Sequence, residues 1–110
     1  MSQITTHVLD TALGRPAAGV PVTLDHRTGG RWTLLDQAVT DADGRVGQLG
    51  ADSLEPGDYR LSFDTASYFT ATGQTGFFPE VTLVFAVADA SHHHVPLLLS
   101  PFAFSSYRGS

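Results

Sequence analysis

Residues that favour turns recur at short intervals along the 110-residue chain, and they limit every regular element to a few residues. Clusters of Gly, Pro and polar turn formers stand at positions 14–16, 28–30, 41–44, 55–58, 73–76 and 100–101. The runs between these clusters are rich in Val, Thr, Phe and Leu, which are typical of β-strands. Short apolar runs that are separated so regularly by turn residues predict an all-β fold, a sandwich or a barrel.

The runs between the turns predict seven strands, with residues 46–49 as one more. The seven are residues 4–9, 20–26, 32–39, 59–63, 81–87, 95–99 and 102–107. In residues 59–63 the apolar side chains fall at every second position, so this strand has one face in water. Apart from Thr82, residues 81–88 and 95–99 are apolar on both faces, which indicates a central strand or a face covered by another subunit. For the C-terminal run we favour a second subunit, because a terminal strand is often a sheet edge.

One run breaks the β pattern, and no run marks a domain boundary. Residues 65–73 begin with side chains that suit an N-cap and end in Gly73, which predicts one short helix of two turns. The chain has no internal repeat, linker or low-complexity segment, and its length fits one hydrophobic core. We therefore expect a single domain that spans residues 1–110.

The composition excludes several classes of function. A net charge of −5, with six basic residues that are all arginine, leaves no basic patch for nucleic acid. No apolar run reaches the roughly 20 residues of a membrane helix, and the N-terminus lacks the features of a signal peptide, so we expect a cytoplasmic protein that does not bind membranes. Because Cys and Lys are absent, the chain has no thiolate nucleophile, disulfide or Schiff-base lysine.

Five histidines are the side chains that titrate near neutral pH: His7, His26, His92, His93 and His94. On a strand, His92 and His94 point to one side and His93 to the other, which is the spacing of a His-x-His zinc pair with His7 as a third ligand. The signal is weak, because closed zinc sites usually recruit Cys and no His-Glu-x-x-His helix is present. The alternative is a polar strand start with one imidazole hydrogen-bonded and the others in solvent.

Other polar residues give little indication of a metal site or of a catalytic nucleophile. Asp43-Gly44 fails the spacing of a calcium-binding loop and predicts a hairpin turn with Gly44 at positive φ, which places Arg45 at the start of a strand. The serines lack a Gly-x-Ser-x-Gly motif, so water is the better nucleophile for any hydrolysis. Arg108 stands close to the C-terminus, where an arginine is solvated unless the tail is held in place.

Seven segments spread over the whole chain stand out as motifs. They are His7-Val8-Leu9-Asp10, Gly14-Arg15-Pro16-Ala17, Asp43-Gly44-Arg45, Gly57-Asp58-Tyr59-Arg60, Phe77-Phe78-Pro79-Glu80, His94-Val95-Pro96-Leu97-Leu98-Leu99-Ser100 and Tyr107-Arg108-Gly109-Ser110. Together, and in this order, they resemble the transthyretin-related 5-hydroxyisourate hydrolases. The terminal Tyr-Arg-Gly-Ser is the most specific, because in this family it separates the enzyme from transthyretin itself. Residues 101–106 depart from the family, which more often has tyrosines and glycine there.

The resemblance implies a fold, an assembly and a reaction. The fold is a transthyretin-like β-sandwich of two four-stranded sheets with one short helix, assembled as a homotetramer with active sites at the dimer–dimer interface. The reaction is that of a cyclic amide hydrolase in urate degradation, in which water opens the six-membered ring of 5-hydroxyisourate on the route to allantoin. The resemblance implies no cofactor and no metal.

The resemblance also implies a set of site residues. The catalytic residues are His7, Arg45, His94 and Ser110, and the substrate-binding residues are His7, Arg45, Tyr107, Arg108 and Gly109. These types suit the reaction, since a neutral imidazole takes a proton from water and arginine binds the carbonyls of a planar heterocycle. Either His94 or His7 serves as the general base, and the roles of His92 and His93 stay open. Two alternatives are a transthyretin-like module that binds a small ligand without turnover, and a zinc hydrolase that uses His92 and His94.

Overall fold

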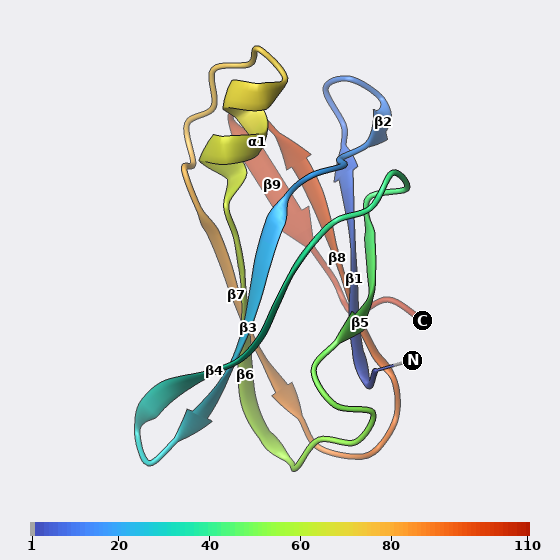
Figure 1. The fold of residues 1–110 in the computed structure, drawn as a ribbon, viewed down its shortest axis with the longest axis vertical. Helices are drawn as coiled ribbons and strands as arrows, with labels where there is room; N and C mark the ends of the chain where they lie inside the picture. The colour runs from blue at the N-terminus through green and yellow to red at the C-terminus, as the bar shows by residue number, and fades with distance from the viewer. Residues whose placement is uncertain (1) are drawn as a thin grey trace.

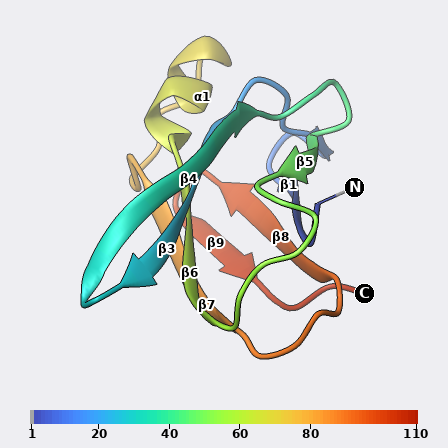
Figure 2. The same ribbon diagram turned by 60° about the horizontal axis from the view of Figure 1, so that its bottom comes forward.

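The chain folds into two β-sheets packed face to face, and the computed structural model describes residues 2–110 (Figure 1). The first sheet contains β1 (Ile4–Asp10), β2 (Arg15–Pro16), β5 (Arg45–Leu49), β8 (His93–Ser100) and β9 (Ala103–Ser106). The second contains β3 (Pro21–Thr28), β4 (Arg31–Val39), β6 (Gly57–Phe63) and β7 (Val81–Val87). The strand orders are β2-β1-β8-β9, with β5 also on β1, and β4-β3-β6-β7. Figure 2 shows the two layers from a second direction.

The predicted β-sandwich with one short helix is confirmed, with one strand more than expected. The first sheet has five strands rather than four, because the two-residue strand β2 pairs with the end of β1. Helix α1 (Thr65–Ala71) starts after Asp64, whose Oδ1 accepts from the backbone N–H of Ser67 at 3.0 Å, and Gly73 follows it at a φ of +69°. No helix among residues 2–110 has the length and apolar character needed to cross a membrane.

Two expectations about the strands are wrong. The run 95–99 lies in β8, which is central between β1 and β9, because the chain reverses at residues 100–102 and β9 takes the sheet edge. The turn before Arg45 does not form a hairpin, although Gly44 has the expected positive φ of +75°. Strands β4 and β5 belong to different sheets, and β5 pairs with β1.

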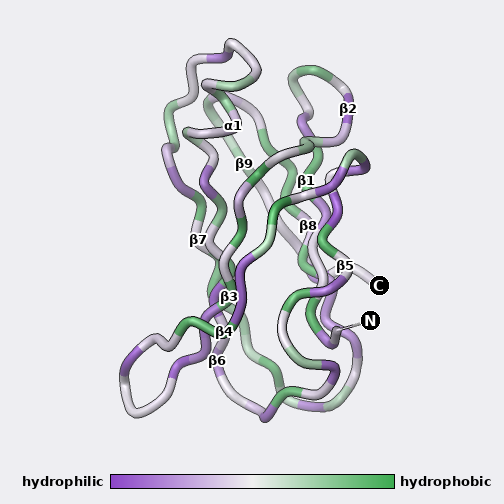
Figure 3. The backbone as a smooth tube through the Cα atoms, in the orientation of Figure 1, coloured by the Kyte–Doolittle hydropathy of each residue, from purple (hydrophilic) through white to green (hydrophobic). Residues whose placement is uncertain are grey.

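One hydrophobic core fills the space between the sheets. Along β1, Ile4 and Val8 are fully buried, and along β8 the buried Leu97 and Leu99 follow the same alternation. The second sheet contributes Leu61 and its neighbours Leu24 and Phe63. Figure 3 shows the resulting alternation of hydrophobic and hydrophilic residues along the strands. The first sheet thereby keeps its other face free for polar groups.

A buried carboxylate ties the end of β1 to the helix. Asp10 is 1% exposed and accepts hydrogen bonds from Tyr68 Oη (2.6 Å), Gln74 Nε2 (3.0 Å) and the backbone N–H groups of Ala12 (3.0 Å) and Leu13 (2.8 Å). Burial raises the pKa of Asp10, but these bonds, that from Tyr68 foremost, outweigh it and hold the pKa below its ordinary value. Burial and Asp10 together raise the pKa of Tyr68 to about 12. The pair is therefore a charged acceptor and a neutral donor at neutral pH.

We expect Tyr68→Phe to lower the free energy of unfolding by about 1–3 kcal/mol, because a buried charged acceptor loses a donor. The folded pKa of Asp10 lies below its unfolded value, so its contribution is present above pH 3.8 and is lost as the pH falls through the folded pKa. Urea denaturation at neutral pH measures the loss. Tyr107→Phe is the matched control, since Tyr107 is 59% exposed. Equal losses in both variants would show that the Asp10 bond contributes nothing.

Candidate active site

The pairing of three strands gathers polar side chains on the outer face of the first sheet. Strands β1 and β8 run parallel with Thr5 beside His94, and β5 pairs with β1 so that Arg45 lies opposite His7. Since side chains alternate along a strand, Thr5 and His7 share the face opposite the buried Ile4 and its alternating neighbours. The pairing therefore brings His7, Arg45 and His94 to one face of neighbouring strands.

A hollow of about 190 Å³ opens on this face. It is lined by Thr5, Thr6, Arg45, Val46, Gly47, His92, His94 and Ser110. Three of the four predicted catalytic residues, Arg45, His94 and Ser110, thus meet around one space. His7 lies beside Arg45 but is not among the lining residues.

A tight turn places Arg45 at the rim of the hollow. Asp41 Oδ1 accepts from the backbone N–H groups of Asp43 and Arg45, each at 2.9 Å. Gly44 has a φ of +75°, and a Cβ atom on it would lie 2.3 Å from the carbonyl oxygen of Val8. The backbone of this turn thus presses directly on β1, where Val8 donates its N–H to Gly44 O at 2.7 Å. Only glycine allows this approach, which fixes the start of β5 and therefore Arg45.

His7 has a defined tautomer. Its Nε2 lies 2.9 Å from the carbonyl oxygen of Asp43. Because a carbonyl oxygen only accepts, Nε2 carries the proton, and the lone pair of the neutral ring is on Nδ1. His7 thus holds the same turn that positions Arg45.

His94 is half-buried and suited to stay neutral. Its Nδ1 lies 2.8 Å from Thr5 Oγ1, and the same oxygen lies 2.8 Å from His92 Nε2. Burial lowers the pKa of His94, and His92, Arg45 and His7 lower it further. A neutral imidazole at neutral pH has one lone pair free to accept a proton. Sequence reasoning missed Thr5, although its place two residues before His7 puts it on the same strand face.

The arrangement of the histidines bears on the zinc alternative. His92 and His94 do share one face, as their spacing predicts, with ring centroids 6.1 Å apart. His93 points the other way, is 4% exposed and donates from Nδ1 to Ser91 O at 2.7 Å. Within residues 2–110, no three His, Asp or Glu side chains group in a way that could hold a metal ion.

The C-terminal tail passes directly over His94. Gly109 donates its N–H to His94 O at 2.8 Å, and a Cβ atom placed on Gly109 would lie 2.6 Å from Cδ2 of His94. The absence of a side chain lets the tail cross the ring and deliver Ser110 to the hollow. The tail is therefore held by the sheet.

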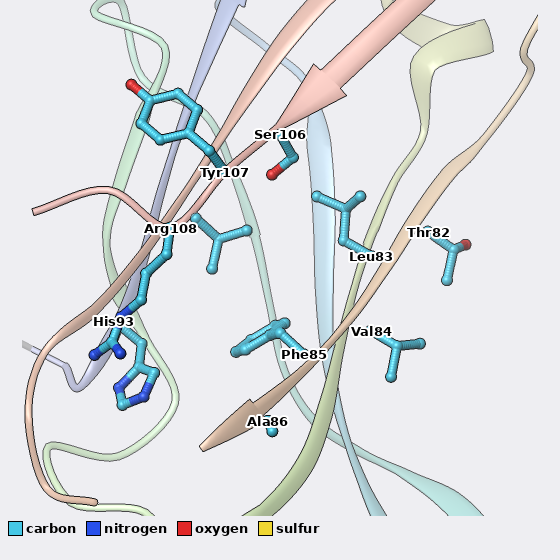
Figure 4. Close-up of a pocket in the computed structure, with 10 residues that line it drawn as sticks. Thr82, Leu83, Val84, Phe85, Ala86, His93, Ser106, Tyr107 and Arg108 are labelled. Atoms are coloured by element: carbon cyan, nitrogen blue, oxygen red, sulfur yellow. The ribbon is translucent and has the colours of Figure 1, made fainter. Parts of the chain in front are cut away.

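Arg108 and Tyr107 lie elsewhere in a single chain. Arg108 Nη2 donates to Ser91 Oγ at 3.0 Å and to His92 O at 3.5 Å. Both residues line a second hollow of about 320 Å³ between β7 and the tail. Figure 4 shows Leu83 and Phe85 pointing into it from β7. The structure does not bring these two side chains to the hollow of Arg45 and His94, and their role in binding substrate stays a prediction.

Comparisons with known proteins agree with one another. The model of the HIUase/Transthyretin family matches residues 4–109. A 5-hydroxyisourate hydrolase of Deinococcus radiodurans is 48% identical over 97% of this chain and 95% of its own length. The uric acid degradation bifunctional protein TTL of Arabidopsis thaliana is 49% identical over 97% of this chain, which spans 37% of that longer protein.

Solved structures with the same fold include both an enzyme and a transthyretin. The 5-hydroxyisourate hydrolase of Klebsiella pneumoniae is 36% identical with a TM-score of 0.87, over 97% of this chain and 98% of its own. Transthyretin from Sparus aurata is 32% identical with a TM-score of 0.93, over 99% of this chain and 97% of its own. Backbone similarity alone therefore does not separate the two.

We expect Gly109→Ala to displace the tail, because the added Cβ overlaps the His94 ring. Overpacking of about 1–3 kcal/mol corresponds to roughly five- to 150-fold faster exchange of the residue 109 amide hydrogen, which NMR measures. Gly47→Ala is the matched control, since a Cβ there meets nothing within 4 Å. Unchanged amide exchange in Gly109→Ala would contradict the close approach.

Proposed function

The chain belongs to the HIUase/Transthyretin family, and from this membership we propose that it is a 5-hydroxyisourate hydrolase of urate degradation. Relatives named 5-hydroxyisourate hydrolase, similar over nearly the whole chain, support this activity. The observation that carries the proposal is the meeting of Arg45, His94 and Ser110 around one hollow. It supplies a base, a fixed positive charge and a hydroxyl group in one place.

In the proposed reaction, water attacks a carbonyl carbon of the six-membered ring. His94 takes a proton from the water as the water oxygen bonds to that carbon, and the ring C–N bond then breaks as the protonated His94 gives this proton to the leaving nitrogen. The product is a ureidoimidazoline carboxylate. Between the two candidate bases, His94 is favoured, since it lines the hollow and its pKa is lowered, whereas His7 lies outside. In this scheme His7 supports the turn of Arg45 through its bond to Asp43 O.

In the proposed reaction Arg45 stabilises the negative charge that develops during attack, and Ser110 binds substrate or water. The guanidinium of Arg45 is the fixed positive partner for the oxyanion and for the carbonyls of the substrate. The Ser110 hydroxyl hydrogen-bonds to substrate or water. Neither role involves a cofactor.

A transthyretin-like module that only binds a small ligand is the competing function. The high TM-score to the Sparus aurata transthyretin favours it. The two functions differ in one observable, because a binding module leaves the decay rate of 5-hydroxyisourate unchanged.

We also propose that the chain forms a homotetramer with active sites at the dimer–dimer interface. Exposed aromatic side chains near the β9 edge support assembly: Phe77 is 67% exposed, Phe102 71% and Tyr107 59%. A monomer rarely leaves such a group of large apolar side chains in water, and a second copy of the chain would cover them. The cytoplasmic location stays a prediction, which fractionation of the source cells tests.

We expect the protein to accelerate the decay of freshly made 5-hydroxyisourate, followed by absorbance. His94→Asn should lower kcat by about 10²–10⁴-fold through loss of the base, and Arg45→Ala by about 10²–10³-fold through loss of the oxyanion partner. Arg31→Ala is the control, because Arg31 begins β4 on the other sheet and is exposed.

The decay rate, its response to a chelator and the mass in solution decide between the alternatives. Decay that is no faster than in buffer overturns the enzyme and leaves the binding module, whereas turnover lost on chelation favours the zinc hydrolase. The mass in solution, measured by sedimentation, should be four times that of the 11.7 kDa chain, and a single-chain mass overturns the tetramer.

The pH profile should report the environment of His94. Its folded pKa lies below the ordinary 6.5, and protonation removes the lone pair, so kcat/KM should be level around neutral pH and fall only below pH 6.5. Initial rates over a pH series, corrected for spontaneous decay, give the midpoint. A midpoint at or above 6.5 contradicts His94 as the base.

A further inference from the structure

One hydroxyl group joins the two histidines on the outer face of the first sheet. Thr5 Oγ1 lies 2.8 Å from His94 Nδ1 and 2.8 Å from His92 Nε2. Thr5 is 5% exposed, and the parallel register of β1 and β8 places it directly beside His94. The two imidazole rings flank it with their planes 26° apart. Thr5 and His94 are held by the two paired strands, and His92 reaches Thr5 from the exposed segment just before β8.

The number of hydrogen atoms on the hydroxyl group and the two neutral rings allows two arrangements of these hydrogen bonds. A hydroxyl group has a single hydrogen, so it donates to one nitrogen and accepts from the other, and a neutral imidazole has a single N–H. In the first arrangement Thr5 donates to His92 and accepts from His94 Nδ1–H, which leaves the lone pair of His94 on Nε2. In the second, Thr5 donates to His94 Nδ1, and the proton of His94 is on Nε2. Only the first gives His94 a free lone pair beyond Thr5.

We propose that Thr5 is a positioning residue that, with His92, holds His94 in the tautomer with its proton on Nδ1 and its lone pair on Nε2. The inference rests on the proposed function, since it specifies how His94 acts as base. Nearby charge favours this tautomer. Arg45 lines the same hollow as His94 and has only hydrogen-bond donors, so an acceptor nitrogen on His94 suits this space better than a second N–H.

Protonation of His92 should break this arrangement. A charged His92 donates from both nitrogens, so Thr5 must accept from Nε2 and donate to His94, which moves the proton of His94 to Nε2. The charged and titratable groups that act on His94 are His92 itself, Arg45 on β5 and His7 on β1, and Arg108 on the tail donates to His92 O at 3.5 Å. Thr5 thereby links the charge of His92 to the tautomer of His94.

The test is NMR of the imidazole nitrogens, in which ¹⁵N shifts separate protonated from unprotonated nitrogen. The wild-type protein at neutral pH should show His94 protonated at Nδ1 only, and Thr5→Val should give a mixture of His94 tautomers. Turnover of Thr5→Val should fall about tenfold in kcat with little change in KM, and Thr5→Ser, which keeps the hydroxyl, should restore both readouts. Thr11→Val is the matched control, because the Thr11 hydroxyl bonds to Leu99 O at the far end of β1.

The two readouts separate this inference from the proposed function. A wild-type His94 protonated at Nε2, or a His94 tautomer that is the same in Thr5→Val, overturns the role of Thr5 whatever the activity. A protein with no turnover overturns the hydrolase, while the ¹⁵N shifts still report whether Thr5 selects the tautomer. Loss of turnover in Thr5→Ser equal to that in Thr5→Val also overturns the inference, because it points to packing rather than to the hydroxyl.

Discussion

The parallel pairing of β1 with β8 is the constraint on which the rest of the structure depends. It joins residues near the two ends of the chain, with Thr5 and His94 separated by 89 positions. Parallel neighbours need a long crossover, and here the second sheet and the helix form that connection. Because β1 and β8 occupy the centre of the first sheet, β5 and β9 add on either side. The β5 side carries Arg45, and the chain beyond β9 carries Ser110.

The position of the C-terminal tail depends on this pairing, and the tail adds hydrogen bonds to the start of β8 and to the loop before it. Gly109 bonds to His94 O at the start of β8, and Arg108 Nη2 bonds to Ser91 Oγ in the preceding loop. Two anchors in sequence fix the direction of the chain, so that Ser110, although exposed, ends at the hollow. A terminal residue gains a defined place because its neighbours are hydrogen-bonded. Arg108 is exposed, as expected so near the end, but its guanidinium is hydrogen-bonded to the loop before β8.

Period-two alternation, turn residues and helix caps were enough to predict the helix, the shared face of His92 and His94 and every strand except the two-residue β2, whose Arg15 and Pro16 belong to a cluster of turn residues. These are local properties, since alternation states which face a side chain takes. Alternation does not state which strands pair. The hairpin before Arg45 was therefore a wrong prediction, because Asp43-Gly44 has the same local chemistry whether the next strand pairs with β4 or with β1. For the same reason the sequence could place Thr5 on the strand face of His7 but could not show its contacts with His92 and His94, which exist only through the β1–β8 register.

That register also explains how one fold serves an enzyme and a transthyretin with nearly the same backbone. Ile4 and Val8 are fully buried in the core, and a slip of one residue in β1 would move them to the outer face and turn Thr5 and His7 inward. The apolar core thus selects the register, and the register alone decides which side chains meet on the outer face. Substitutions on that face leave the core and the backbone unchanged, so chemistry can appear or disappear there at little cost to folding. We propose that the difference in function lies in a few outward side chains, of which His94, Arg45 and the residues that orient them are the ones to compare.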